Sequence, residues 1–136
     1  GLNGGMGGVQ TAALAVGGYT GSYSAAVEEY DGTNWTSGNS LITNARAKPG
    51  LGGTQTSMLV GGGEGPSVVY TNTELYDGTN WQTSASLGSA QGAGSSFGTS
   101  SAMNMAVGTN GTSNLAINQE FTSETTAANI VSVTTS

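Results

Sequence analysis

The side chains that could do chemistry in this chain of 136 residues are mainly carboxylates, because the chain contains no His and no Cys. The Ser–His and Cys–His pairs of nucleophilic catalysis, and the usual His/Cys zinc ligand sets, are therefore excluded. Glu28 and Glu29 are adjacent. On a strand they would point to opposite faces and could not act on one substrate. We therefore expect no catalytic residue and no enzymatic activity, and we expect Glu28 and Glu74 to brace neighbouring strands or structural units.

A second candidate is the motif Tyr-Asp-Gly-Thr-Asn-Trp, which occurs at residues 30–35 and again, 46 positions later, at residues 76–81. The oxygens of Asp31 and Asp77, together with the Asn side chains that follow them, are ligands that calcium accepts. A turn explains the motif equally well, because Asp-Gly between two strand-forming segments is typical of a type I′ β-hairpin. We interpret the motif as a structural hairpin, and we expect neither a metal nor a cofactor.

The motif is part of a repeat, which predicts the architecture. Three units cover the chain, at residues 1–47, 48–92 and 93–136. The third is degenerate: Met105–Gly108 and Gln119–Phe121 keep the pattern, but the turn and the tryptophan are lost. Each unit reads as four short strands, and four strands in 40 to 50 residues are typical of a propeller blade. Glycine is frequent and no segment has a helical period, so helix should be nearly absent.

The second unit gives the clearest strand assignment. We predict a glycine-rich inner strand at 50–55, an apolar strand at 56–60, a third strand at 71–76 and the start of a fourth at 81–84, with a polar loop at 64–70. Stacking against neighbouring units would then supply the core of each sheet. The aromatic residues that we expect to lie between units are Tyr30, Trp35, Tyr76 and Trp81.

Composition and charge exclude several classes of partner. The net charge is −6, and Arg46 and Lys48 are the only basic residues. Such a chain cannot neutralise a nucleic-acid backbone, and it lacks the basic cluster that attracts anionic lipid. No apolar run approaches the roughly 20 residues that span a bilayer, so we expect no membrane insertion. No signal peptide is visible, and the glycine-rich start at Gly1 suggests a processed product or a piece of a longer protein.

The variable parts of the repeat are the connections at residues 19–26, 64–72 and 109–118. They differ in sequence while the strands around them repeat, and variable loops on a rigid scaffold are common sites of binding. Aromatic and polar side chains in these loops could stack on sugars or contact a protein, or could merely cover the loop edges. The candidate partner-contact residues are Tyr19, Tyr23, Glu64, Tyr70 and Asn110.

The order of these segments resembles the kelch repeat. In the first unit the resemblance rests on Val16-Gly17-Gly18, Glu28-Glu29-Tyr30-Asp31, Trp35 and a downstream Arg46. The second unit matches except for its arginine, because Ser89-Ala90-Gln91 occupies that region. The resemblance implies an all-β fold of kelch-like four-stranded blades, with about three blades in this chain. Closed propellers have about four to eight blades. Further blades could therefore lie upstream, identical chains could pool their blades, or the units could form an open or threefold assembly.

A narrower resemblance points to a function. Segments such as Gly52-Gly53-Thr54-Gln55-Thr56 are similar to kelch-like repeats in structural proteins of tailed bacteriophages, especially marine and cyanobacterial phages. The Thr/Val/Ser-rich end at 130–136 resembles the terminal strand of such proteins. The resemblance implies a non-enzymatic virion protein of the tail or a surface appendage, oligomeric, with other virion proteins, its own copies and a host surface glycan as partners. The alternative is a secreted bacterial carbohydrate-binding propeller module.

Overall fold

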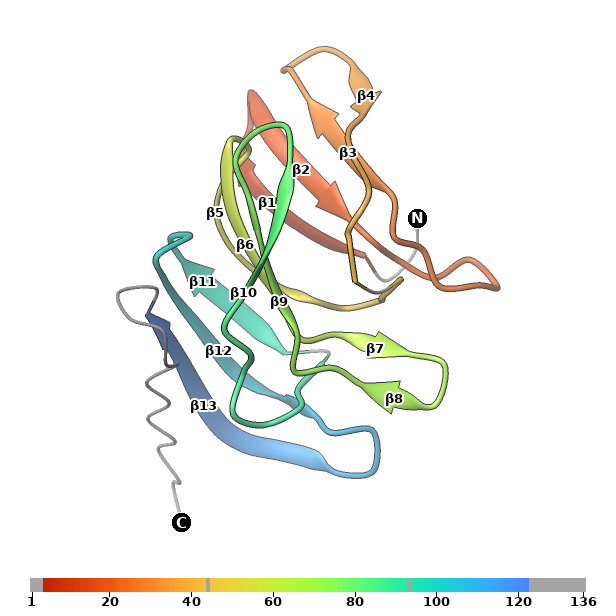
Figure 1. Cartoon of the computed structure of the whole chain (residues 1–136), viewed down its shortest axis with the longest axis vertical. Helices are drawn as coiled ribbons and strands as arrows, with labels where there is room; N and C mark the ends of the chain where they lie inside the picture. Colours follow the sequence, from red (N-terminus) through yellow and green to blue (C-terminus); the bar gives the residue numbers. More distant parts are fainter. Residues whose placement is uncertain (1–3, 44, 93, 123–136) are drawn as a thin grey trace.

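The fold is all-β. The computed structural model describes residues 4–43, 45–92 and 94–122. As predicted, no helix forms within these ranges. Three antiparallel sheets follow one another along the chain, and a small two-stranded hairpin projects from the second (Figure 1). Each predicted repeat unit contributes one of the three sheets.

Sheet 1 consists of β1 (Gly5–Val9), β2 (Ala12–Val16), β3 (Val27–Tyr30) and β4 (Trp35–Ser37). The strands lie in sequence order, β1-β2-β3-β4, and each pairs with the next in antiparallel fashion. This is the simplest order for strands joined by short connections.

Sheet 2 repeats this arrangement. It contains β5 (Gly50–Thr54), β6 (Ser57–Gly61), β9 (Thr73–Tyr76) and β10 (Trp81–Ser84) in the spatial order β10-β9-β6-β5. All four strands were predicted to within about two residues. The expectation of a polar loop at 64–70 was wrong, because this segment folds into the hairpin of β7 (Glu64–Gly65) and β8 (Val68–Val69).

Sheet 3 contains β11 (Ser95–Gly98), β12 (Ala102–Thr109) and β13 (Asn114–Thr122), in that spatial order. The predicted loop at 109–118 was too long, because β12 and β13 pair as far as Thr109 and Asn114 and leave a short turn between them. The fourth strand that we predict for this unit, and the predicted terminal strand at 130–136, fall outside the described residues.

The three sheets share one register, which fixes equivalent residues. Gly8 pairs with Ala13, Gly53 with Met58, and Gly98 with Met103 at the same place in the first hairpin of each sheet. The equivalence extends to the glycine that follows the second strand. Gly17 and Gly62 have φ of 67° and 63°, and Val107 has φ of 51° at the same position. The third unit therefore keeps the left-handed backbone of the repeat, although a β-branched residue is strained there.

The first strands of the sheets lie innermost, where β5 contacts both β1 and β11. Glycine allows this close approach, as the sequence predicted. A Cβ on Gly50 would lie 2.8 Å from Sδ of Met105, and a Cβ on Gly52 would lie 2.9 Å from Cγ of Met103. The glycines of β5 thus leave room for the methionines of sheet 3.

The core is divided into two layers, each between adjacent sheets. Met58 and Val60 of β6 face sheet 1, whereas Leu59 between them faces sheet 3, as the alternation of a strand requires. The layer between sheets 1 and 2 contains Leu14, Val16, Val27, Leu41, Leu51, Met58, Val60, Tyr76 and Trp81. The layer between sheets 2 and 3 contains Leu59, Leu87, Met103, Met105 and Phe121.

The aromatic pairs of the repeated motif do not share one environment. Tyr76 and Trp81 are buried between sheets 1 and 2, as predicted, with ring centroids 4.7 Å apart. Tyr30 and Trp35 form an equivalent pair at 5.0 Å, but Trp35 remains 45% exposed. The expectation that all four rings lie between units was therefore wrong for Trp35, because its face of sheet 1 has no described neighbour.

Candidate functional site

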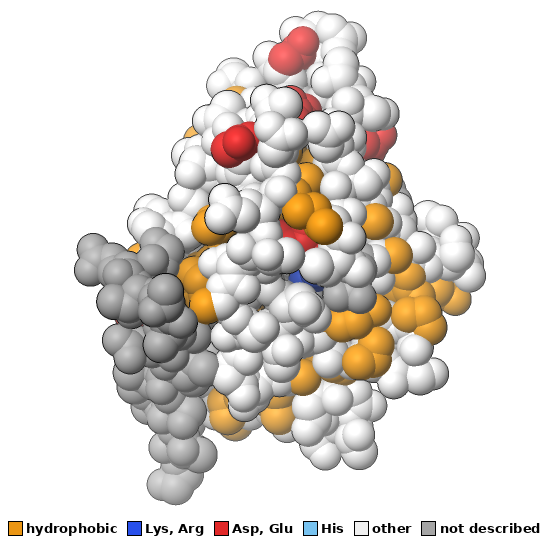
Figure 2. Space-filling view, in the orientation of Figure 1, with side chains coloured by type: hydrophobic (Ala, Val, Ile, Leu, Met, Phe, Trp, Pro, Cys, Tyr) orange, Lys and Arg blue, Asp and Glu red, His pale blue; other side chains and the backbone are white. Residues whose placement is uncertain are grey.

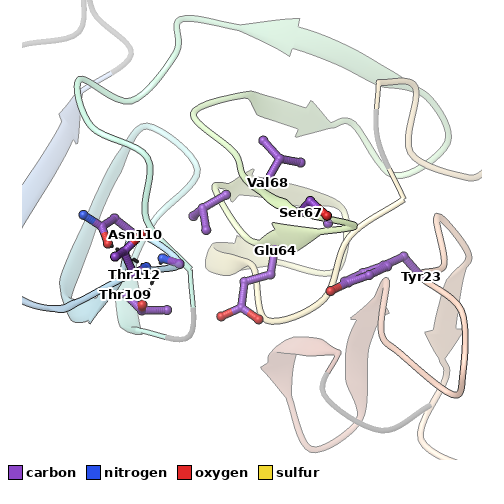
Figure 3. A pocket seen from close by; sticks show the side chains of 10 residues that line it. Tyr23, Glu64, Ser67, Val68, Thr109, Asn110 and Thr112 are labelled. Atoms are coloured by element: carbon purple, nitrogen blue, oxygen red, sulfur yellow. Dashed lines mark hydrogen bonds between the residues drawn. The ribbon is translucent and has the colours of Figure 1, made fainter.

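The variable connections from all three units meet on one side of the molecule. The β2–β3 loop, the β7–β8 hairpin and the β12–β13 turn project to the right in Figure 1. They border a hollow of about 400 Å³, which we call the loop hollow. Three of the five predicted contact residues, Tyr23, Glu64 and Asn110, line it (Figure 3). The remaining lining residues are Gly65, Ser67, Val68, Val69, Thr109, Gly111 and Thr112.

Glu64 is the charged group of the loop hollow. Its backbone pairs with that of Ala47, with N–O distances of 2.7 and 2.8 Å, which anchors the start of β7 to the linker from sheet 1. Its Oε2 lies 2.9 Å from Nζ of Lys48, and both side chains are partly exposed. Such a pair contributes little to stability, so Glu64 can exchange Lys48 for another donor at low cost.

Asn110 holds the opposite wall. Its Oδ1 accepts hydrogen bonds from the backbone N–H groups of Thr112 and Ser113, at 3.0 and 2.9 Å. The side-chain oxygen is thus committed to its own turn, a usual role of Asn. Its amide nitrogen and the Thr112 hydroxyl remain the groups that Asn110 and its turn could offer to a ligand.

The other two predicted contact residues lie differently. Tyr19 pairs with Tyr23 within the β2–β3 loop, with ring centroids 4.9 Å apart, and stands beside the hollow. Tyr70 is half-buried beneath the hairpin, and its ring centroid lies 5.6 Å from the guanidinium carbon of Arg46. We therefore assign Tyr70 to the packing of the sheets.

Arg46 is the centre of a polar contact that joins sheets 1 and 2. The linker from β4 carries it, and its side chain is fully buried in sheet 2. Nη1 donates to the carbonyl oxygens of Gly62 and Asn72 at 2.9 and 3.1 Å, and Nη2 lies 2.9 Å from Oε1 of Glu74. Burial lowers the pKa of Arg46, and the charge of Glu74 opposes this shift.

Glu74 is held by the same linker. The backbone N–H of Ile42 donates to its Oε2 at 2.8 Å, and the backbone N–H and hydroxyl of Thr43 donate to its Oε1. The expected bracing role of Glu74 is therefore present in the structure. We call the set of Arg46, Glu74 and their linker donors the polar clasp. Glu28, in the equivalent place on β3, is exposed, and its carboxylate has no hydrogen-bond or ion-pair partner among the described residues.

A neutral version of the polar clasp joins sheets 2 and 3. Gln91 and Gln119 are both fully buried, and Nε2 of Gln119 donates to Oε1 of Gln91 at 2.5 Å. Nε2 of Gln91 donates to the carbonyl oxygen of Val107, and Oε1 of Gln119 accepts from the backbone of Ser89 at 3.1 Å. Gln91 thus occupies the place of Arg46 in the second unit. The missing arginine is evident in the sequence, but its replacement was not predicted, although Gln91 lies 45 residues after Arg46, at the repeat offset.

The turns of the repeated motif have a structural role, but their type was predicted wrongly. Tyr30 pairs with Trp35 around a four-residue loop, closed by a 3.1 Å bond from N of Asp31 to O of Asn34. Gly32 has a positive φ of 95° in this loop and Asp31 does not, which excludes type I′. Oδ1 of Asp31 accepts from the backbone of Thr33 and Asn34, and Asp77 does the same in its own loop.

These carboxylates are therefore occupied by their own backbone. Bonds from the two N–H groups lower the pKa of both Asp31 and Asp77. Figure 2 shows acidic side chains at the end of the molecule that carries the β3–β4 and β9–β10 hairpins. Among the residues that the structure describes, no three His, Cys, Asp or Glu side chains gather into a set that could hold a metal ion. No helix of these residues is long and apolar enough to cross a membrane.

The fold has a solved counterpart. The structure of YjhT superposes on 95% of this chain with a TM-score of 0.80, at 16% sequence identity. This chain spans 45% of the length of YjhT. No protein-family model and no curated protein sequence matches the chain. At this identity the likeness concerns the fold alone.

Proposed function

We propose that this chain is a non-enzymatic structural and interaction protein, and that its three sheets are kelch-like propeller blades. Its place would be the virion of a tailed bacteriophage, in the tail or a surface appendage. The blade assignment is supported by the common register of the sheets and by their stacking through equivalent faces. The virion assignment is supported by the resemblance of the repeat segments to phage structural proteins.

The loop hollow carries the proposal of a binding role. The contacts that join the sheets recur from unit to unit, as expected of a scaffold. The loop hollow does not recur: Tyr23, Glu64 and Asn110 come one from each unit, and the units differ in sequence at these positions. Four of the charged residues elsewhere serve the scaffold: Arg46 and Glu74 pair with each other, and Asp31 and Asp77 cap their turns. A rigid scaffold with a variable polar hollow is suited to recognition of another virion protein or a host surface.

The location can be tested on particles. Purified virions, washed and separated by density, should contain the chain at a fixed copy number by quantitative mass spectrometry. Immunogold labelling should then mark the tail or an appendage. A chain that is removed by washing, or whose copy number varies between preparations, would exclude a structural role in the virion.

A second candidate is a secreted carbohydrate-binding module of bacterial origin. The observation that favours it is the pairing of an aromatic ring, Tyr23, with hydroxyl and amide groups across the loop hollow. Sugars are bound by this combination of stacking and hydrogen bonds. Glycan-array binding that is lost in Tyr23→Ala and kept in Tyr19→Ala would favour this candidate when the chain is absent from virions.

A further inference from the structure

The face of sheet 1 that points away from sheet 2 is open, although its equivalents are closed. Met6 on this face is 69% exposed, whereas the equivalent Leu51 of sheet 2 is 8% exposed. Trp35 and Trp81 differ in the same way, at 45% and 7%. The sequence thus keeps on sheet 1 the side chains that sheet 2 buries against its neighbour. Together with Val9, they form an exposed apolar surface of the kind that marks interaction sites.

The polar part of this face matches the surroundings of Arg46. A hollow of about 530 Å³ lies here, and Gly17, Ala26 and Glu28 are among the residues that line it. Their equivalents in sheet 2 are three groups that accept hydrogen bonds from Arg46. These are the carbonyl oxygens of Gly62 and Asn72 and the carboxylate of Glu74. Gly17, Ala26 and Glu28 therefore offer the same three acceptors as sheet 2, but no cation in the described chain donates to them.

We propose that this face is the docking surface for a further four-stranded unit of the same kind, whose outgoing linker inserts an arginine towards Gly17, Ala26 and Glu28. The inference rests on the proposed blade architecture and adds the chemistry of the incoming unit. A linker that supplies only this arginine is insufficient, because Met6 and Trp35 require an apolar sheet face as well. The incoming unit would present an apolar face like the one that sheet 1 presents to sheet 2, which carries Leu14 and Val27.

The charge on Glu28 specifies an arginine rather than a glutamine. In this chain the acidic Glu74 is buried with Arg46, and the neutral Gln119 is buried with Gln91. A carboxylate buried against a neutral amide would lack a countercharge, which is strongly unfavourable. Docking onto Glu28 therefore requires a cation from the incoming unit.

A second copy of this chain does not supply that cation. The chain has two basic residues, Arg46 and Lys48. Arg46 is buried in its pair with Glu74, whereas Lys48 pairs with Glu64 at the surface. The ammonium of Lys48 is a point charge and lacks the planar fork with which Arg46 reaches two carbonyl oxygens and a carboxylate at once. The outer face of sheet 3 is mixed in character. By strand alternation it carries the exposed Phe97 beside Asn104, Asn118 and Glu120, opposite to the buried Met103, Met105 and Phe121. The occupant is therefore a repeat unit with its own arginine, from outside the present sequence.

The proposal can be tested by supplying such a unit. In an extended chain, residues 1–49 would be followed by residues 5–136, so that the added Arg46 enters at the position that precedes sheet 1. The added Trp35 is replaced by Phe, which leaves the resident Trp35 and the buried Trp81 as fluorophores. Acrylamide quenching of the resident Trp35 should fall several-fold, towards that of Trp81. Arg46→Gln in the added unit should restore quenching, and adding Glu28→Gln in the resident unit should protect Trp35 again by recreating the Gln91–Gln119 pair.

Three results would overturn the proposal. The resident Trp35 could remain as accessible as in the natural chain, whether or not the added unit resists protease. Arg46→Gln in the added unit could leave the protection unchanged. The natural chain could itself protect Trp35 as its concentration rises, which would make a second copy the occupant. With any of these three results, the proposed function would still stand if Trp81 stays buried and immunogold labelling marks the chain on virions.

The natural chain provides an independent check. Glu28→Gln should not change its urea midpoint, because Glu28 has no described partner, whereas Glu74→Gln should lower it. An equal loss in the two variants would show that Glu28 is already paired, and would also overturn the proposal.

Discussion

Arg46 and Glu74 form an ion pair in which both side chains are fully buried, with Nη2 and Oε1 2.9 Å apart. The pair belongs to two units at once, because Arg46 comes from the linker that leaves sheet 1 and Glu74 from β9 of sheet 2. It therefore fixes how the two sheets stack. The next interface has Gln91 and Gln119 at the equivalent positions, which shows that the fold accepts a neutral pair but keeps the pairing.

Removing one partner of the polar clasp should be costly. Arg46→Ala should lower the free energy of unfolding by about 3–5 kcal/mol, because Glu74 would remain buried without its countercharge. The measurement is urea denaturation followed by fluorescence. The double variant Arg46→Gln with Glu74→Gln is the control, and it should be more stable than Arg46→Ala because it copies the pair between sheets 2 and 3. A double variant as unstable as the single one would show that Arg46 acts through packing alone.

The two tryptophans of the repeated motif should differ in their contribution to stability. Trp81→Ala should cost about 3–5 kcal/mol, since it leaves a cavity between sheets 1 and 2 and removes the bond from Nε1 to O of Asn39. Trp35→Ala should cost no more than about 1 kcal/mol, because its ring is half exposed. Thermal and urea unfolding of the two variants would compare them directly. Equal losses would contradict the open face of sheet 1.

The repeat made much of this fold predictable, but not the difference between its interfaces. The strands of sheet 2 were placed because apolar and glycine segments recur at fixed spacing, and Tyr23, Glu64 and Asn110 were selected because their loops vary. Sequence could not show that these three residues line one hollow, since that depends on how the sheets stack. The exposure of Trp35 was missed for a related reason. Identical motifs predict identical conformations, whereas burial depends on the neighbour.

The same limit applies to side chains with specific partners. Tyr70 was predicted as a partner-contact residue, and sequence could not show that its ring lies against Arg46. Gln91 was read as the loss of an arginine, because the hydrogen bond to Gln119 that replaces the ion pair involves a residue 28 positions away. The turn type was wrong because the Asp31 carboxylate organises its loop through the backbone of Thr33 and Asn34.

The motif turns should lose stability in acid. Their backbone bonds lower the folded-state pKa of Asp31 and Asp77. The contribution of each residue is therefore present above the unfolded pKa of about 3.9 and is lost as the pH falls through the folded pKa. Asp77→Asn should flatten the decline in melting temperature below about pH 4, because an Asn oxygen can accept the same bonds without titrating, as Asn110 does. An unchanged acid profile in this variant would show that the Asp77 turn is not a source of the dependence.

Tyr76 should make the chain sensitive to alkali. Burial raises its pKa, and the hydrogen bond from its hydroxyl to Glu29 raises it further. The stabilisation is complete below the unfolded pKa of about 10 and is lost as the pH rises from there through the folded pKa. Tyr76→Phe should therefore lose less stability above about pH 10 than the natural chain does. In an absorbance titration of the folded natural chain, Tyr76 should ionise only above the pH range in which an ordinary tyrosine titrates. The matched control is Tyr30→Phe, on the half-buried equivalent residue.

The sheets stack through equivalent faces, and the face of Trp81 on sheet 2 is covered while the equivalent face of Trp35 on sheet 1 is open. Acrylamide quenching of two single-tryptophan variants is the most direct test of this arrangement. Trp81→Phe leaves Trp35 as the reporter of the open face, and Trp35→Phe leaves Trp81 as the reporter of the closed one. At low protein concentration the Stern–Volmer constant of Trp35 should be several-fold larger than that of Trp81, with an emission maximum at longer wavelength. Equal quenching of the two residues, both protected or both accessible, would contradict the stacked arrangement and its open face.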